Sequence, residues 1–165
     1  MVPFKHIPVM LPQVIGYLNC IPGKIYVDCT LGGSGHARAI CKKIIPGGIF
    51  IGIDQDIDAV SNTKKILTPL NLTIHLFHDN FIHLPELLQQ LKIDAVDGIL
   101  LDLGISLHQL ESSGRGFSFN KDEPLDMRMN STSGTTAGDL INDMEEKNLK
   151  KIFYTFGEER WAGQI

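Results

Sequence analysis

Asp28-Cys-Thr-Leu-Gly-Gly-Ser-Gly-His36, followed downstream by Ile51-Gly-Ile-Asp54, is the stretch that decides the fold of this chain. A short β-rich run, 24–28, leads into the glycines, and a second one, 48–53, leads into the later aspartate. The segment 37–44 between the two runs has helical composition. This order predicts a βαβ unit, whose crossover is right-handed in nearly all proteins.

The glycine loop between strand and helix predicts a site for the nucleoside end of a cofactor. Gly32, Gly33 and Gly35 allow a sharp turn and a close approach of a ligand to the backbone. The loop also brings the N-terminal N–H groups of the helix to the carboxyl end of the first strand. Asp54 stands 54 − 32 = 22 residues after the first glycine, the spacing at which an acidic residue binds the two ribose hydroxyls. A plain tight turn is the alternative.

The form of the loop favours S-adenosylmethionine over a dinucleotide. In the dinucleotide pattern G-x-G-x-x-G, Gly33 and Gly35 would be the first two glycines and Arg38 would stand at the third. A large side chain there hinders close packing of the helix on the strand. We therefore expect a site for a nucleoside joined to an amino acid, with a nicotinamide-dependent oxidoreductase as the less favoured alternative.

Length, charge and cysteine content bound the class of protein. The chain has 165 residues, 43% of them hydrophobic, which suffices for a domain with a core. Its formal net charge of −4 argues against binding of nucleic acid through overall positive charge. Any RNA contact therefore needs a local patch of basic residues. Three cysteines without metal-ligand spacing indicate buried thiols in a reducing compartment. No signal peptide or membrane-spanning run is visible, which predicts a cytoplasmic protein without a membrane partner.

The rest of the chain predicts an α/β fold with a doubly wound parallel sheet. An amphipathic stretch precedes the first strand, and strands and helices alternate after the second; the expected ranges are 9–18, helix 56–67, strand 72–77, helix 84–91 and strand 95–101. The expected strand order is 3-2-1-4, with ligands over the carboxyl ends of the strands. The apolar fourth strand is typical of an interior strand, so a sheet that stops there would be incomplete.

The last third of the chain changes character. Residues 102–130 form a long irregular segment rich in Gly, Ser and Pro, and such loops are usually functional. Asp143-Met-Glu-Glu146 predicts a capping box at the start of a helix that ends at Gly157. Residues 158–165 predict the first turns of another helix.

Several side chains outside the glycine loop are candidates for a site. Asp102 ends the fourth strand, where a carboxylate in a doubly wound sheet faces the ligand, and a solvated capping role is the alternative. Phe81, after the third strand, can pack on an adenine or belong to the core. Gln109 is an ordinary surface glutamine on composition alone.

The long loop carries groups suited to an unstacked base. Aromatic rings and guanidinium planes stack on bases, and arginine also meets phosphate. The candidate substrate contacts are Arg115, Phe117, Asp126 and Arg128. The alternative is an Ω-loop packed on its own Phe and Met side chains. No metal is expected, because His75, His78 and His83 fit no common ligand spacing.

Taken together, these motifs resemble the RsmH/MraW family of bacterial 16S ribosomal RNA cytidine N4-methyltransferases. The matching strings are His6-Ile-Pro-Val-Met10, Tyr26-Val-Asp-Cys-Thr30, Gly32-Gly-Ser-Gly-His36, Gly52-Ile-Asp-Gln-Asp56, Asn80-Phe81, Asp97-Gly-Ile-Leu-Leu-Asp-Leu-Gly-Ile-Ser106, Gln109-Leu110, Arg115-Gly-Phe-Ser-Phe119, Pro124-Leu-Asp-Met-Arg-Met129 and Gly157-Glu-Glu-Arg160. They run in order over essentially the whole chain, and several of them are rare strings.

The resemblance implies a Rossmann-like, S-adenosylmethionine-dependent methyltransferase. The cofactor residues that it implies are Ser34, Gly35, His36, Asp54, Phe81, Asp102 and Gln109. Asp102 is also the catalytic residue that we expect. The implied substrate is a cytidine in the decoding region of 16S rRNA, within the small ribosomal subunit.

The chain departs from the family pattern at one contact loop and in length. Many members have a second serine where this chain has Leu107. The family also continues through a helical insertion and returns to finish the sheet. By this resemblance, residues 1–130 form the cofactor-binding domain and residues 131–165 the start of a truncated insertion or substrate domain. The alternative to an active enzyme is a non-catalytic fragment that binds S-adenosylmethionine or RNA.

Overall fold

The computed structural model describes residues 8–165 and forms two compact units. One unit ends at Ser112 and the other spans Ser113–Ile165. The first contains α1 (Leu11–Leu18), β1 (Ile25–Asp28), α2 (Gly35–Ile44), β2 (Ile49–Asp54), α3 (Ile57–Leu67), β3 (Thr73–His78), η1 (Phe81–His83), α4 (Leu84–Leu91), β4 (Gly98–Leu100) and α5 (Leu107–Glu111). The second contains α6 (Ala137–Asp143) and α7 (Glu146–Gly157). The domain boundary expected at residue 130 stays a prediction.

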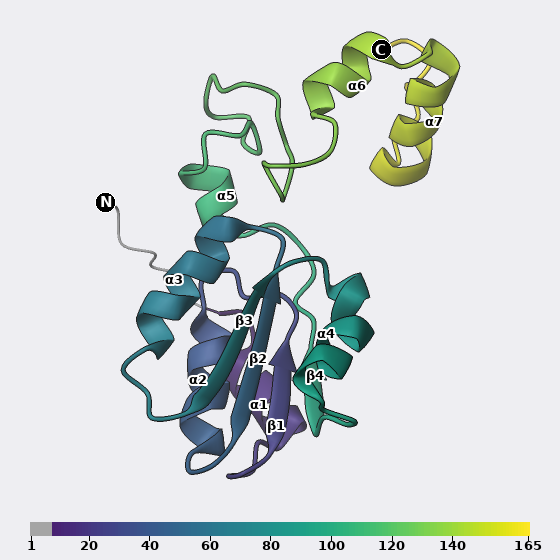
Figure 1. Ribbon diagram of the computed structural model, residues 1–165. Coiled ribbons are helices and arrows are strands. Elements are labelled where there is room, and N and C mark those ends of the chain that lie inside the picture. Colours follow the sequence, from purple (N-terminus) through teal and green to yellow (C-terminus); the bar gives the residue numbers. More distant parts are fainter. Residues whose placement is uncertain (1–7) are drawn as a thin grey trace. The chain divides into compact units, whose positions relative to one another are not determined.

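The first unit is built on a four-stranded parallel sheet in the order β3-β2-β1-β4, which confirms the predicted fold class and strand order. Tyr26 and Phe50 lie in a buried cluster with side chains of α1, α2 and α3. Val27 and Ile51 face the other way and form a second cluster with α4. Figure 1 shows α2 and α3 on the opposite side of the sheet from α4. Both faces of the sheet are therefore covered, as parallel sheets require.

Strand register brings three carboxylates to the carboxyl edge of the sheet. Asp28, the last residue of β1, pairs with Gly52 of β2 on one side and with Leu100 of β4 on the other. Asp54 and Asp102 each stand two residues beyond those partners. The short parallel pairing thus places one aspartate at the end of each of three adjacent strands.

β4 is shorter than the sequence predicts. Residues 95–101 read as a buried interior strand, but only Gly98–Leu100 pairs, and within residues 8–165 it pairs with β1 alone. Ile99 is 44% exposed because no further element covers it in the described chain. The expected extent of the strand was wrong, since an apolar run does not report whether a neighbouring strand exists.

An apolar stripe continues from β4 along the following segment. Every second residue from 99 to 105 is a large exposed aliphatic side chain: Ile99, Leu101, Leu103 and Ile105. An open sheet edge with such a stripe is a template for association with another chain.

Leu103→Lys, at the most exposed position of this stripe, should reduce self-association and leave the fold intact. The free energy of unfolding should change by less than about 0.5 kcal/mol, because the side chain is mostly in water. Sedimentation velocity over a concentration series measures the association. Ile57→Lys, at an exposed position of α3 outside the stripe in sequence, is the control, and an equal effect of both variants would contradict the assignment.

The predicted end of α7 at Gly157 is confirmed, but its predicted start and the segment that follows it differ in the structure. The capping box expected at Asp143 was wrong, because this residue ends α6 and α7 begins after Glu145 without a side-chain cap. A capping box occurs instead at Thr136, whose hydroxyl accepts the N–H of Asp139 at 3.0 Å. Residues 158–165 form turns and no helix.

Candidate cofactor site at the carboxyl edge of the sheet

Asp54 ties the glycine loop to the end of β2. Its Oδ2 accepts the N–H of Gly32 at 2.9 Å, and its Oδ1 accepts the N–H of Asp56 at 2.8 Å. Burial raises the pKa of Asp54, and these two hydrogen bonds partly offset that effect. Each carboxylate oxygen keeps a further lone pair, so the group can still accept the hydroxyls of a ribose.

The glycine loop turns through two left-handed residues, Gly32 at φ +43° and Ser34 at φ +66°. The Ser34 side chain is buried and points at α3, where its Oγ lies 2.7 Å from Oγ1 of Thr63 and accepts a hydrogen bond from Asn62 at 3.0 Å. Its N–H donates to the carbonyl of Leu31 at 2.7 Å. Ser34 therefore fixes the shape of the loop, and its predicted contact with a cofactor stays a prediction.

Gly35 and His36 open α2 beneath the segment that precedes α1. A Cβ on Gly35 would lie 2.6 Å from Cγ of Pro8, so a protein contact already requires glycine here. Nε2 of the buried His36 lies 3.0 Å from the carbonyl oxygen of Val9 and must be the donor, since a carbonyl only accepts. His36 thereby turns Nδ1 toward Asp102, whose Oδ2 is 3.8 Å away.

The segment after β4 is held to β1 and α3 by polar contacts. The N–H of Asp102 donates to Oγ1 of Thr30 at 2.8 Å. Ser106 and Gln109 form a capping box at the start of α5, and Nε2 of Gln109 donates to Oδ2 of Asp56 at 3.0 Å. Gln109 is 5% exposed, so its interpretation as a surface glutamine was wrong. Its amide thus ties α5 to Asp56, the residue that caps α3, and its predicted contact with a cofactor stays a prediction.

Phe81 lies at the start of η1, after β3. It is partly buried and packs against the cluster between the sheet and α4. Asn80 before it accepts the N–H of Ile82 at 3.0 Å and donates to Oε1 of Gln55 at 3.2 Å. The ring thus has a core contact and partial exposure together, and its adenine contact stays a prediction.

Asp28 is a candidate that sequence reasoning missed. Its side chain is fully buried, and its Oδ1 accepts the N–H of Thr30 at 3.0 Å. Among residues 8–165, no hydrogen-bond partner reaches its Oδ2. The pKa of Asp28 is raised to about 7, mainly by burial and to a smaller extent by the charges of Asp54 and Asp102. The only sequence signal was its place before the glycine loop, which says nothing of its burial.

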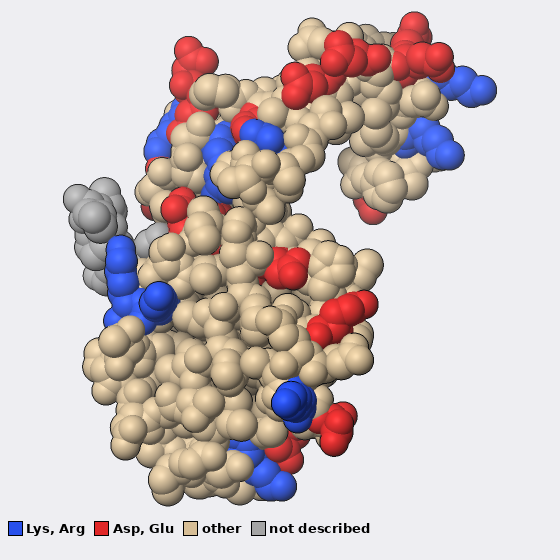
Figure 2. Space-filling view, in the orientation of Figure 1, with Lys and Arg blue, Asp and Glu red and all other residues tan. Residues whose placement is uncertain are grey.

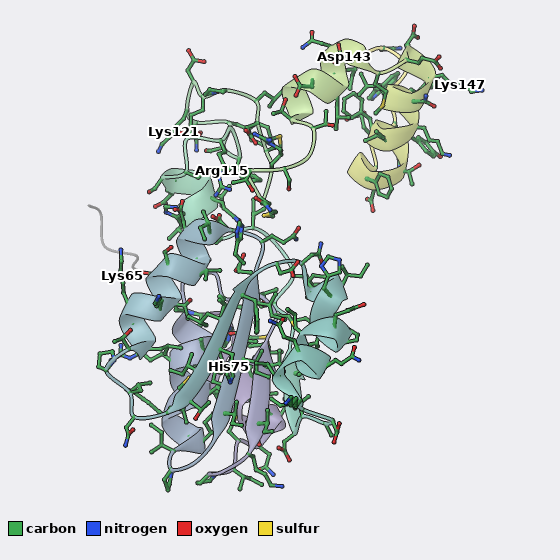
Figure 3. The ribbon with its side chains drawn as sticks, in the orientation of Figure 1. Lys65, His75, Arg115, Lys121, Asp143 and Lys147 are labelled. Atoms are coloured by element: carbon green, nitrogen blue, oxygen red, sulfur yellow. The ribbon has the colours of Figure 1, made fainter. Side chains whose placement is uncertain are left out.

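The four candidate substrate contacts come together within the second unit. Nη1 of Arg115 donates to the carbonyl oxygens of Arg128 and Met129 at 3.0 and 2.9 Å, and its guanidinium lies 5.5 Å from the ring centre of Phe117. Arg128 forms a bidentate pair with Asp126 at 2.9 and 2.6 Å, which lowers the pKa of that carboxyl to about 2. Figure 3 shows Arg115 inside this loop. These contacts favour a loop packed on itself, and contact with a substrate stays a prediction.

Other classes of site were searched in the described part of the chain. His75 lies on β3 (Figure 3), and no group of three or more His, Cys, Asp or Glu side chains arranged for a metal occurs in residues 8–165. The cysteines at 20, 29 and 41 are free thiols. Within the same residues, every helix is too short or too polar to cross a bilayer.

Comparison with curated proteins gives close matches over nearly the whole chain. It is 51% identical over 162 residues to "Ribosomal RNA small subunit methyltransferase H" of Desulforapulum autotrophicum. It is 50% identical to the protein of the same name from Desulfosudis oleivorans. Each alignment covers 98% of this chain and 52% of the relative, so the chain spans about half the length of these relatives.

A solved structure and a family model agree with these matches. The crystal structure of a putative rRNA-methylase from Clostridium thermocellum is similar, with a TM-score of 0.52 and 26% identity over 61% of this chain and 54% of that one. The family model described as the MraW methylase family matches residues 3–165. With this match over almost its full length, the chain belongs to the MraW methylase family.

Proposed function

We propose that this chain carries the S-adenosylmethionine site of a methyltransferase that modifies N4 of a cytidine in 16S rRNA of the small ribosomal subunit. The observation that carries the proposal is the bond from the N–H of Gly32 to Oδ2 of Asp54, which locks a ribose-binding carboxylate onto the glycine loop. The names of the relatives, which are ribosomal RNA methyltransferases, point to the substrate. We propose a cytoplasmic location, because the proposed rRNA substrate is found there.

The residues at the carboxyl edge fit this cofactor. It presents a ribose for a paired acceptor, and Asp54 offers two oxygens with free lone pairs. It also presents cationic groups, and the buried Oδ2 of Asp28 lacks a partner within the described residues. The residues that we propose to hold it are Ser34, Gly35, His36, Asp54, Phe81, Asp102 and Gln109. When bound, it supplies a methyl group activated by a sulfonium.

We propose that Asp102 orients the reacting amine and accepts its proton. The exocyclic amine of cytidine is a weak nucleophile because its lone pair is delocalised into the ring. A carboxylate that accepts an N–H hydrogen bond orients the amine and takes up its proton as nitrogen becomes tetrahedral. The side chain of Asp102 is 37% exposed and so can reach a substrate, and Nδ1 of the buried His36 lies at 3.8 Å from it.

The loop from Asp102 to Met129 is the proposed holder of the base. A base must leave its stack before its amine can be methylated, and a loop with aromatic and guanidinium groups suits that state. Lys and Arg side chains are scattered in small groups on the face drawn in Figure 2, mixed with Asp and Glu. With a formal net charge of −4 for the whole chain, we propose that RNA contact depends on a few side chains such as Arg115 and Phe117.

The test is a calorimetric titration of the chain with S-adenosylmethionine, repeated with NADH. We expect binding of the first and none of the second. Incubation with radiolabelled cofactor and unmethylated 30S subunits then separates the two readings of the chain: label in 16S rRNA identifies an enzyme, and binding without transfer identifies a non-catalytic cofactor-binding part. A folded chain that binds NADH alone would overturn the proposal.

A further inference from the structure

We propose that Asp28 couples cofactor binding to proton release: the carboxylates of Asp28, Asp54 and Asp102 together balance the positive charge of the methyl donor, and Asp28 gives up a proton when that charge arrives. This inference rests on the proposed cofactor. It assigns Asp28 a positioning role exerted through its charge, because its side chain is buried.

The geometry places Asp28 between the other two carboxylates. It ends the central strand β1, while Asp54 ends β2 on one side and Asp102 follows β4 on the other. Thr30 links two of the three, since its N–H donates to Oδ1 of Asp28 and its Oγ1 accepts the N–H of Asp102. The cluster is thus one connected piece of the carboxyl edge.

Neither form of the Asp28 carboxyl is satisfied in the described structure. An ionised carboxylate would be buried with an oxygen that accepts nothing, and a protonated one would have an O–H without an acceptor in residues 8–165. Buried polar groups of this kind are rare and carry a free-energy penalty. A nearby cation removes the penalty for the ionised form, because opposite charge favours ionisation.

Within residues 8–165, the charged groups that act on Asp28 include no such cation. The charges that act on its carboxyl are those of Asp54 and Asp102, and both raise its pKa. Cys29 directly follows Asp28, and Cys41 lies on α2. Burial and the charge of Asp28 raise the pKa of both thiols. His36 of α2 faces Asp102. A positive ligand is the missing element of this edge.

The expected pH dependence follows from the pKa of about 7. Below pH 7 Asp28 is protonated in the free chain, so donor binding must displace a proton. The affinity for S-adenosylmethionine therefore decreases as the pH is lowered. Above pH 7 the carboxylate is already ionised and the affinity levels off. If the pKa of Asp28 is much lower in the complex, the affinity for S-adenosylmethionine is about tenfold lower at pH 6 than at pH 8.

A consequence concerns the product. On methyl transfer, the methyl carbon would leave sulfur and bond to N4 of the cytidine, which loses a proton, so the sulfonium of the donor would become a neutral thioether. The three carboxylates then face one positive charge fewer. Binding of the product S-adenosylhomocysteine should therefore release fewer protons than binding of the donor. Asp28 would in this way help the site to favour donor over product at neutral pH.

The experiment is a calorimetric comparison of wild type and Asp28→Asn with S-adenosylmethionine at pH 6, 7 and 8, in two buffers of different protonation enthalpy. The wild type should release about half a proton at pH 7 and nearly one at pH 6, and Asp28→Asn should lack this component. Titration of the ligand's own amine is common to both proteins and cancels. Asp94→Asn, at an exposed aspartate, is the matched control and should behave like wild type.

The outcomes separate the two proposals. Equal proton counts in wild type and Asp28→Asn would overturn this inference and leave the cofactor site standing. A folded wild type that does not bind the donor would overturn both. Should Asp28→Asn fail to fold, carboxyl ¹³C NMR of wild type decides: a midpoint near 7 that drops on adding donor supports the coupling, and a midpoint near 4 in the free chain overturns it.

Discussion

Asp54→Ala should weaken S-adenosylmethionine binding by about a hundredfold or more. The substitution removes both oxygens that would receive the ribose hydroxyls, and hydrogen bonds to a charged group contribute about 1.5–3 kcal/mol each. It also releases the N–H groups of Gly32 and Asp56, which the carboxylate holds at 2.9 and 2.8 Å. The loop then loses its attachment to β2. Calorimetry at pH 8, where Asp28 is ionised, measures the effect.

Two controls make this result specific. Asp54→Asn keeps one acceptor oxygen and should lose less affinity than Asp54→Ala, while Asp94→Ala, at an exposed position, should lose none. Circular dichroism confirms that each variant is folded. A change of less than about threefold for Asp54→Ala would show that ribose recognition lies elsewhere.

Gly48→Ala should lower the free energy of unfolding by about 3 kcal/mol, the upper end of the range for overpacking a core. A Cβ at this position would lie 2.6 Å from the carbonyl oxygen of Ile44 and 2.7 Å from its Cβ. The same carbonyl already accepts the N–H of Gly48 at 3.2 Å, so the turn from α2 into β2 cannot open without losing that bond. Thermal unfolding should show a midpoint lower by roughly 10 °C.

The matched control is Gly16→Ala, which adds the same methyl group inside α1. Nothing lies within 4 Å of a Cβ at Gly16, so this variant should be neutral or stabilising by up to about 1 kcal/mol through helix propensity. Equal melting temperatures for the two variants would contradict the close approach of the chain at residue 48.

The sequence carried the central part of the fold because its signals are local. The glycine loop, the flanking β-rich runs and Asp54 at the end of the second run need no knowledge of distant residues, and all took their expected places. The strand order followed from the same alternation of elements. These features depend on backbone conformation and residue spacing, which a sequence displays directly.

What the sequence missed depends on partners far along the chain. The contact of the Ser34 hydroxyl with Thr63, 29 residues later, could not be read from the sequence, and the predicted cofactor contact of Ser34 stays a prediction. Gln109 reads as a surface residue, but Asp56, 53 positions earlier, holds its amide in a buried contact. Oδ2 of Asp28 lacks a hydrogen-bond partner within residues 8–165, and this depends on all the residues that pack around it. No local pattern encodes such pairings.

The crossing of Pro8 and Val9 over the glycine loop bears on how this protein should be handled at the bench. Pro8 fills the space above Gly35, and the carbonyl of Val9 fixes the ring of His36. An affinity tag or fusion partner attached directly before Pro8 would therefore be tethered beside the glycine loop, and handles for purification or labelling are better placed away from this contact.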